Sequence, residues 1–307
     1  MDRTKQARTY FLLIFTTVVW GFQPTCIKWL VAVWSPVTVT SVRHLIISLV
    51  LLAVAWRQSG SAIWPRGLKC WLGVIGMGFT GITLNNVLQF TGLEETTVTN
   101  CTLIAATSPA LTAAFAAVFI RERLSLLSWF GIVVSFGGVL AVVSHGSWEV
   151  VRQIDFNRGD LFCFASQMAW ILYSFIGLRV MKRLTAAAAT GWAGLTGAGM
   201  TWGYGLAAGD FQVTALALQP MLSFLYTIVL GGILAMLFWN IGVREAGPSL
   251  SSIFLNIMPV VGMMAGYFCF DDEIGAVQLG GALAICSGVY LTTHSEQAVH
   301  MVHHVFR

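Results

Sequence analysis

The chain has 307 residues, of which 57% are hydrophobic and only 10% are charged, and its formal net charge is +4. Soluble domains are about half apolar and carry about a quarter of charged residues, so this composition excludes an ordinary water-soluble globular protein and favours a membrane protein. No block of Lys and Arg is long enough to predict a nucleic-acid-binding surface.

Long apolar stretches follow one another along the whole chain. A helix that crosses the hydrocarbon core of a bilayer needs roughly 20 apolar residues. The first stretch is too long for the apolar region of a secretory signal and no cleavage site follows it, so we interpret it as a retained span. Ten spans are predicted in this way, over residues 10–33, 36–56, 68–91, 96–120, 125–144, 159–181, 186–208, 221–243, 247–270 and 274–294.

The basic residues predict the orientation of these spans, because cytoplasmic loops of membrane proteins carry an excess of Lys and Arg. With the N-terminus inside, the outer segments hold only Arg152 and Arg158, while Lys28 and Arg43 lie within spans. Both termini, residues 1–9 and 295–307, are then cytoplasmic tails. The other basic residues all fall on the cytoplasmic side: Arg3, Lys5, Arg8, Arg57, Arg66, Lys69, Arg121, Arg123, Arg179, Lys182, Arg183, Arg244 and Arg307.

The two halves of the chain resemble each other at a constant offset of 150 residues. This offset aligns Trp20 with Trp170, Gly81 with Gly231, Gly92 with Gly242, Glu95 with Glu245, Pro109 with Pro259, Gly131 with Gly281, and Gly138-Val139 with Gly288-Val289. The sequence therefore predicts two five-helix repeats, residues 10–144 and 159–294, joined by a periplasmic linker at 145–158. An odd number of spans inverts the second repeat, and inverted repeats are typical of transporters that bind substrate near the midplane and alternate access.

Several matched segments resemble the drug/metabolite transporter superfamily, EamA type. Trp20-Gly21, Lys28, Pro36 and Arg43 resemble its pattern over the first two helices. Further similarity lies in 119–124 with Trp129-Phe130-Gly131, in the stretch 240–259, and in Asp272-Glu273 with Gly288-Val289. Asp271-Asp272-Glu273 departs from the usual Gly-Glu pair of the second junction. The resemblance implies a ten-helix carrier, commonly an exporter of amino acids or related metabolites.

Polar and aromatic side chains within the spans are the candidate substrate-binding groups, since polar groups in a bilayer tend to face the bundle interior or a wet cavity. Amides supply donors and acceptors without a buried charge, and aromatic rings can cover apolar or cationic parts of a substrate. The alternative is that each merely bonds a neighbouring helix. The candidates are Trp20, Gln23, Asn85, Asn86, Gln89, Gln167, Trp170, Tyr173, Trp239, Asn240, Ser252 and Asn256.

Two basic residues and two prolines inside spans suggest further roles. Lys28 and Arg43 predict a positive vestibule for a carboxylate or phosphate, or a gate; the alternative is that Lys28 snorkels and Arg43 bonds helix-end carbonyls. Pro109 and Pro259 predict kinks, because proline removes a backbone hydrogen bond. The six cysteines are interpreted as packing residues, and the terminal His300, His303 and His304 do not predict a metal site.

No Asp or Glu lies deep in a predicted span, which favours facilitated diffusion or exchange over proton coupling, with His44 as the main titratable exception. We expect a small-molecule substrate, the bilayer as environment, no cofactor, no metal and no nucleic acid, and a monomer or homodimer in a bacterial inner membrane. A nucleotide-sugar or sugar-phosphate translocator is the main alternative carrier. The sequence shows no catalytic constellation of an intramembrane enzyme and no selectivity filter of a channel. A lipid-handling protein is an alternative that the sequence does not exclude.

Overall fold

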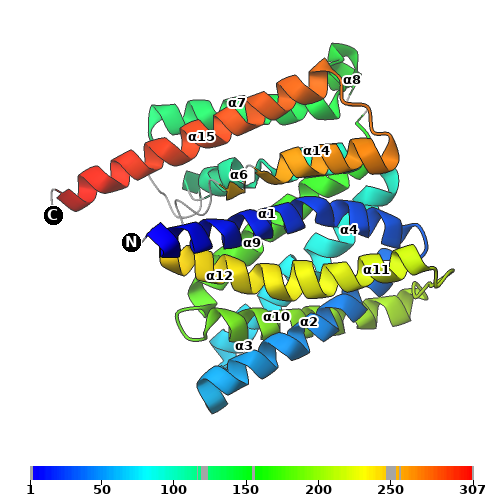
Figure 1. Cartoon of the computed structure of the whole chain (residues 1–307), viewed down its shortest axis with the longest axis vertical. Coiled ribbons are helices and arrows are strands. Elements are labelled where there is room, and N and C mark those ends of the chain that lie inside the picture. The colour runs from blue at the N-terminus through cyan, green and yellow to red at the C-terminus, as the bar shows by residue number, and fades with distance from the viewer. Residues whose placement is uncertain are drawn as a thin grey trace. The chain divides into compact units, whose positions relative to one another are not determined.

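The computed structural model describes residues 3–115, 117–118, 124–153, 156–246, 254–255 and 257–305. In these ranges the regular elements are all helices, apart from an isolated β-bridge between Trp34 and Val213, and the prediction of an all-α protein is confirmed. The elements (Figure 1) are α1 (Arg3–Val31), α2 (Pro36–Ser59), η1 (Gly60–Ile63), α3 (Leu68–Met77), η2 (Gly78–Leu84), α4 (Asn85–Glu95), α5 (Val98–Ala105), α6 (Ser108–Phe115), α7 (Leu126–Val143), α8 (Trp148–Gln153), α9 (Arg158–Val180), α10 (Ala186–Ala208), α11 (Leu218–Tyr226), η4 (Thr227–Leu234), α12 (Ala235–Ala246), α14 (Ile257–Phe270) and α15 (Ala276–Val305).

Among the described residues, 6 continuous helical stretches are long and apolar enough to cross a membrane, and α14 and the first part of α15 are shorter apolar helices. The predicted span 186–208 coincides with α10, but its Gly, Thr and Trp residues lower its mean hydropathy and it is not among the 6. The predicted span 96–120 is instead two short helices, α5 and α6, separated at residues 106–107. The chain is therefore a multi-pass integral membrane protein.

The contacts divide the chain into two compact units, each assembled from both halves of the sequence. Unit 1 comprises residues 1–25, 95–161 and 237–307, and unit 2 comprises 26–94 and 162–236. Neither unit corresponds to one half of the sequence, because within each unit helices from one half pack on helices from the other.

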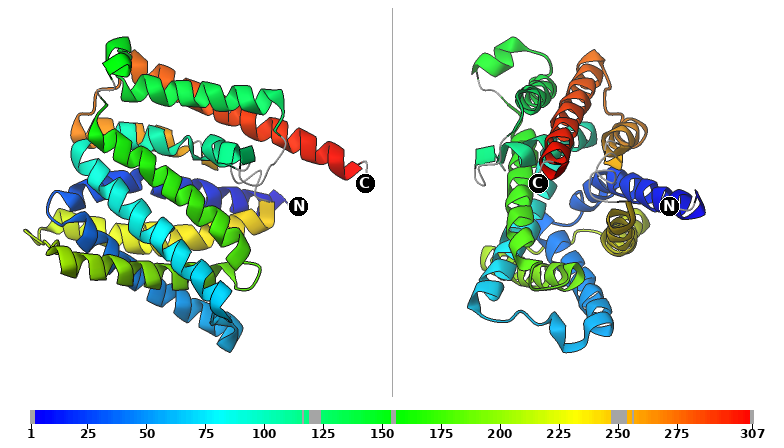
Figure 2. Two further views of the ribbon diagram at one scale, coloured as in Figure 1. Left: turned by 180° about the vertical axis from the view of Figure 1, so that it is seen from behind. Right: turned by 90° about the vertical axis from the view of Figure 1, so that its left-hand side faces the viewer.

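In unit 2, α2 and α10 pack side by side in opposite directions (Figure 2). Ser35, before α2, donates its hydroxyl proton to the carbonyl of Asp210, which follows α10, at 2.6 Å. At the other end the Trp192 indole, near the start of α10, donates to the carbonyl of Ile63 at 2.9 Å. These two bonds fix the antiparallel arrangement.

Unit 2 also contains two π-helical segments, η2 and η4, each of which continues directly into an α-helix. A π-helix bonds residue i to i+5 and is rare, usually occurring as a single wide turn. η2 packs against α10, and η4 packs against α2. Neither segment has a sequence signal that predicts it.

In unit 1, α7 and α15 run antiparallel and in very close contact (Figure 2). A Cβ atom on Gly131 would lie 2.6 Å from the carbonyl oxygen of Gly288, and one on Gly138 would lie 2.8 Å from that of Gly281. Glycine is required at these positions because any side chain would force the two backbones apart. α5 and α14 also pack together in this unit.

The starts of several helices recur at the same offset of 150 residues as the sequence matches, while η2 and η4 occupy nearly equivalent ranges. The pairs with equivalent starts are α2 and α10, α3 and α11, α4 and α12, and α7 and α15.

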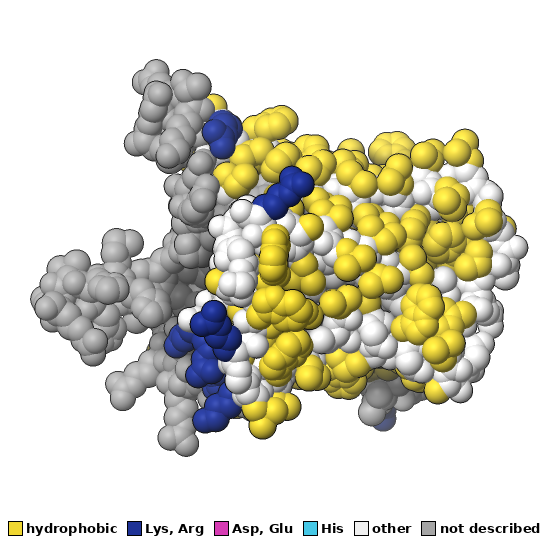
Figure 3. Space-filling model, turned by 90° about the horizontal axis from the view of Figure 1, so that it is seen from below, with side chains coloured by type: hydrophobic (Ala, Val, Ile, Leu, Met, Phe, Trp, Pro, Cys, Tyr) yellow, Lys and Arg dark blue, Asp and Glu magenta, His cyan; other side chains and the backbone are white. Residues whose placement is uncertain are grey.

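Large apolar side chains remain exposed along the helices, for example Leu126 at 90% and Phe268 at 73%. Figure 3 shows one face of the molecule, on which hydrophobic side chains predominate and most of the visible Lys and Arg side chains gather toward one end. An aqueous surface would not expose apolar side chains on this scale, whereas lipid would cover them.

Candidate functional site

A short pairing of two loop segments forms the rim of a pocket in unit 2. The amide of Ser35 donates to the carbonyl of Gln212 at 3.0 Å, and the amide of Thr214 donates to that of Val33 at 2.8 Å. The turn after α10 is possible because Gly209 adopts a left-handed conformation, φ +67°, which glycine adopts without strain. The loop between α1 and α2 is thus tied to the loop between α10 and α11.

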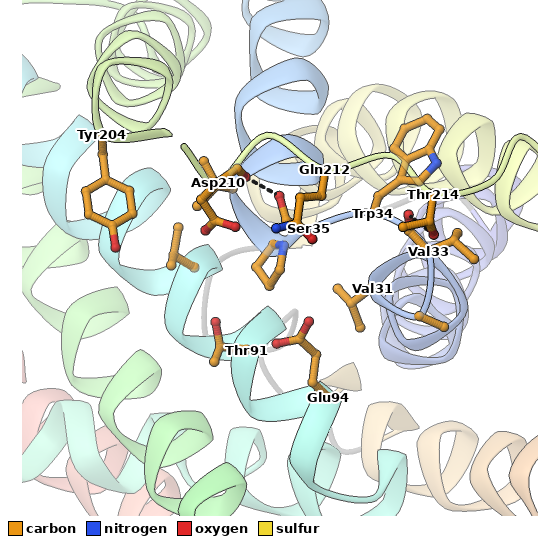
Figure 4. Close-up of a pocket in the computed structure, with 14 residues that line it drawn as sticks. Val31, Val33, Trp34, Ser35, Thr91, Glu94, Tyr204, Asp210, Gln212 and Thr214 are labelled. Carbon is orange, nitrogen blue, oxygen red and sulfur yellow. Dashed lines mark hydrogen bonds between the residues drawn. The ribbon is translucent and has the colours of Figure 1, made fainter. Parts of the chain in front are cut away.

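The pocket has a volume of about 360 Å³ and is lined by apolar residues of the α1–α2 loop together with acidic and neutral polar groups. Figure 4 shows the carboxylates of Glu94 and Asp210 facing the same space from opposite sides, with the hydroxyl of Tyr204 at its edge. Thr91 and Gln212 add further polar groups, and the lining residues in the described chain include no Lys or Arg. Such a lining can attract a positively charged group.

The charged residues of unit 2 are separated between its two ends. The pocket with Glu94 and Asp210 lies at the end where α2 begins and α10 finishes. The opposite end contains the loops around η1 and between α9 and α10, which are brought together by Trp192 packing on the rings of Trp64 and Trp71. The basic residues in these loops and in the adjoining helix ends are Arg57, Arg66, Lys69, Arg179, Lys182 and Arg183.

Arg43 is buried in unit 2 and is bound by neutral protein groups. Its Nε donates to the carbonyl of Thr227 at 3.3 Å, its Nη1 donates to Oδ1 of Asn86 at 3.5 Å, and its guanidinium lies 5.9 Å from the ring centre of Phe90. Asn86 in turn donates through Nδ2 to the carbonyls of Gly81 and Ile82, both at 3.0 Å. Arg43 therefore bonds a carbonyl where α11 passes into η4, and Asn86 bonds carbonyls of η2 that lie four and five residues before it.

The other predicted residues of unit 2 fall into two groups. Asn85 is buried and donates to the carbonyl of Ser166 at 2.8 Å, and Gln167 is buried and donates to the Ser166 hydroxyl at 3.3 Å. Trp170 stacks on Tyr173 with ring centres 4.9 Å apart, and 41% of Trp170 is exposed. Gln89 and Lys28 are half-buried.

In unit 1 the rings of Trp20 and Trp239 lie together, with centroids 5.5 Å apart. Gln23, on the same helix as Trp20, has a buried Oε1 that accepts no hydrogen bond within the described residues. An unpaired buried acceptor is unusual in a folded protein, and such an atom can accept a hydrogen bond from a water molecule or a ligand. Ser252, Asn256 and the side chain of Asn240 lie outside the described residues.

The two prolines occupy comparable positions in unit 1. Pro109 lies in the first turn of α6, directly after the break between α5 and α6, and Pro259 lies in the first turn of α14 and is buried. A first turn tolerates proline, because the missing amide has no partner there in any case.

Two acids that the sequence placed at span ends are buried in unit 1. Asp160 is fully buried and accepts hydrogen bonds from the hydroxyl of Thr96 and the amide of Asn100. Asp272 accepts from the backbone amide of Thr99 at 3.0 Å. Asp272 therefore bonds an amide in the first turn of α5, where the helix dipole favours negative charge, and Asp160 bonds side chains at the same end of this helix.

The pocket acids were missed by reasoning from the sequence. Glu94 and Asp210 both lie outside the predicted spans, and no sequence motif marks either of them. The signal that was present is that Asp210 is the lone acid between Asp160 and Glu245, in a loop predicted to face outward. Its approach to Glu94 depends on the pairing of two loops that are far apart in the sequence.

Comparison with known proteins identifies the family. The model of the EamA-like transporter family matches residues 7–144 and again residues 157–294, and the chain belongs to this family. The two matched segments begin 150 residues apart, at the offset that aligns Trp20 with Trp170. The resemblance inferred from the sequence motifs is confirmed, and the chain is a membrane transporter of the EamA family.

Individual proteins are similar to this chain over most of its length. "Uncharacterized transporter YyaM" of Bacillus subtilis (strain 168) is 28% identical over 297 residues, which cover 93% of each chain. An "Uncharacterized transporter" of Archaeoglobus fulgidus is 23% identical over 287 residues, covering 94% of this chain and 98% of its own. A protein crystal structure with 18% identity shares the fold with a TM-score of 0.62, over 95% of this chain and 99% of that one.

Proposed function

We propose that this EamA-family transporter moves a small polar or amphipathic metabolite, such as an amino acid, across a bacterial cytoplasmic membrane. It acts as an exporter or exchanger, without a cofactor or metal, as a monomer or homodimer. Access to a midplane site alternates between the two sides as two inverted five-helix repeats move. The observation that carries the proposal is the double match of one transporter family model.

The inverted arrangement is supported by helices at equivalent positions in the two sequence halves. α2 and α10 begin 150 residues apart and run in opposite directions within unit 2. α7 and α15 stand in the same relation within unit 1. Helices related by a duplication point in opposite directions if the second copy enters the membrane inverted. Ten spans with both termini cytoplasmic follow from this reading.

The chemistry of the described polar groups favours a substrate that bears an ammonium group. The pocket of unit 2 presents the carboxylates of Glu94 and Asp210, and Gln23 offers an unpaired acceptor in unit 1. A phosphate-bearing substrate, as in the nucleotide-sugar alternative, is less well supported, because Arg43 is engaged by Asn86 and Thr227. The pocket lies at the end opposite the basic loops, which is the outer end by the distribution of Lys and Arg.

The substrate class is tested by uptake into proteoliposomes, with amino acids, polyamines and nucleosides as competitors. We expect amine-bearing compounds to compete. Glu94→Gln and Asp210→Asn are each expected to raise the KM of such a substrate roughly threefold to fivefold, because an exposed carboxylate–ammonium contact is worth up to about 1 kcal/mol.

Glu95→Gln is the matched control, since Glu95 is adjacent to Glu94 but does not line the pocket. An unchanged KM in both pocket variants would remove the ammonium-binding role of this pocket. A panel in which no amine competes would remove the substrate class.

A further inference from the structure

Two rare wide turns occupy nearly the same place in the two halves of the chain, and both lie in unit 2. We propose that η2 and η4 are the parts of unit 2 that change register during transport, and that Arg43 and Asn86 couple one segment to the other. The proposal rests on the proposed transport function and names the device by which unit 2 would move.

A π-helical segment is a source of movement because it holds more residues per turn than an α-helix. Conversion of the wide turns of η2 into α-helix would shift the following α4 by about one residue, a rise of about 1.5 Å and a rotation of about 100°. The same conversion in η4 would shift α12. Because both segments continue without a break into these helices, the movement would be transmitted along them.

A single chain of hydrogen bonds connects the two segments. Asn86 donates to the Gly81 and Ile82 carbonyls in η2, Arg43 donates to Asn86, and Arg43 also donates to the Thr227 carbonyl, at the start of η4. The side chains of Asn86 and Arg43 are 7% and 5% exposed, so water does not compete freely for these carbonyls. A change of register in either segment would break part of this chain and so affect the other segment.

The hydrogen bonds made by Arg43 can be exchanged more easily than those of a strong, fixed contact. Its two donor–acceptor distances, 3.3 and 3.5 Å, are longer than the usual 2.9–3.0 Å of such bonds. Among the described residues no Asp or Glu forms an ion pair with Arg43. A charge bound only by neutral groups and the face of Phe90 can exchange one carbonyl for another without separating opposite charges.

Glycines bring both segments into close contact with neighbouring helices. Gly78 of η2 and Gly197 of α10 meet backbone to backbone, and a Cβ on Gly197 would lie 2.6 Å from the Gly78 carbonyl. Gly232 of η4 faces the side chain of Ile47 on α2. The side chain of Ile82 in η2 lies against Gly197 in the same way, so a change of register in either segment would move these side chains off the glycines.

The first test measures amide hydrogen exchange on the full-length, substrate-free protein in detergent. Arg43→Met is expected to raise exchange about tenfold in both segments, 78–84 and 227–234, because it removes the bond to the Thr227 carbonyl of η4 and the bond to Asn86, which holds the carbonyls of η2. Arg43→Lys, which keeps a donor, is expected to restore part of the protection. Arg57→Met, an exposed residue at the basic end of unit 2, is the control and should leave both segments unchanged.

A rise confined to 227–234, or no rise in either segment, would overturn the coupling. Asn86→Ser removes the central link in the chain of hydrogen bonds between η2 and η4. Its exchange is measured in the same way, so the test stands even if Arg43→Met does not fold. The effects of Arg43→Met and Asn86→Ser should be less than additive in the double variant, since both act on one pathway. Full additivity would also overturn it.

The second test is counterflow with the same variants. A positioning role predicts a turnover at least about tenfold lower with an unchanged KM, whereas a substrate-binding role of Arg43 would raise KM. Loss of coupling in the exchange data with normal transport would refute this inference and leave the proposed function intact. Absence of transport by the wild-type protein would instead refute the proposed function, and the exchange data would still decide the coupling.

Discussion

Single buried polar residues stabilise the fold of this protein, and their position in the sequence does not predict this role. Asp160 is fully buried at the start of α9, where it accepts hydrogen bonds from Thr96 and Asn100. Removing a buried acceptor leaves its donors without partners, and that loss costs more than the bond itself contributes.

Asp160→Ala should therefore lower the free energy of unfolding by about 1–3 kcal/mol, seen as a lower thermal midpoint in detergent. Asp160→Asn, which keeps one acceptor, should lose less. Glu149→Ala serves as the control, because Glu149 is exposed and accepts a hydrogen bond from the exposed Gln153. Equal midpoints for Asp160→Ala and the wild type would contradict the structural role.

The long apolar elements were predictable, whereas the partners of individual side chains were not. The predicted spans 36–56 and 186–208 begin where α2 and α10 begin, because apolar runs and turn residues mark helix ends locally. Arg43, in contrast, bonds a carbonyl 184 residues away, and Glu94 and Asp210 meet through two paired loops. Nothing local marks the π-helical segments. Side-chain contacts between segments that are far apart in the sequence cannot be predicted from periodicity and composition alone.

At the scale of elements, the contact of α7 with α15 depends on glycine at particular positions rather than on glycine content. Gly138 faces the Gly281 carbonyl, whereas a Cβ on the adjacent Gly137 would have no atom within 4 Å. Substitutions at Gly138 and Gly137 therefore distinguish the effect of helix packing from the effect of the low helix propensity of glycine.

Gly138→Ala should destabilise the protein by about 1–3 kcal/mol through overpacking. Gly137→Ala should be neutral or stabilising by up to about 1 kcal/mol, because alanine favours helix over glycine. Thermal unfolding of the two purified variants checks this contrast. Equal stability of the pair would mean that α7 and α15 are not in backbone contact.

At the scale of the whole molecule, the charge distribution of unit 2 predicts which of its ends faces the cytoplasm. Arg57, Arg66, Lys182 and Arg183 lie at one end, and the acidic pocket lies at the other. Basic loops are retained on the cytoplasmic side of the membrane. The pocket end is therefore expected to face outward.

Cysteine labelling in intact cells tests this orientation. In a background with Cys269→Ala and Cys286→Ala, a membrane-impermeant maleimide should label Thr214→Cys from outside. It should label Ser61→Cys and Lys182→Cys only after permeabilisation; all three positions are exposed at their ends of unit 2. The opposite pattern would invert the proposed topology, and with it the assignment of the pocket to the outer side.

Counterflow in proteoliposomes is the measurement that tests a carrier with alternating access most directly. Vesicles containing the wild-type protein and loaded with a competing amine-bearing metabolite should transiently accumulate the labelled compound above its external concentration, since each inward step is coupled to an outward one. A channel or an enzyme gives no such overshoot. Labelled compound that only equilibrates, at a rate independent of the internal load, would contradict the account.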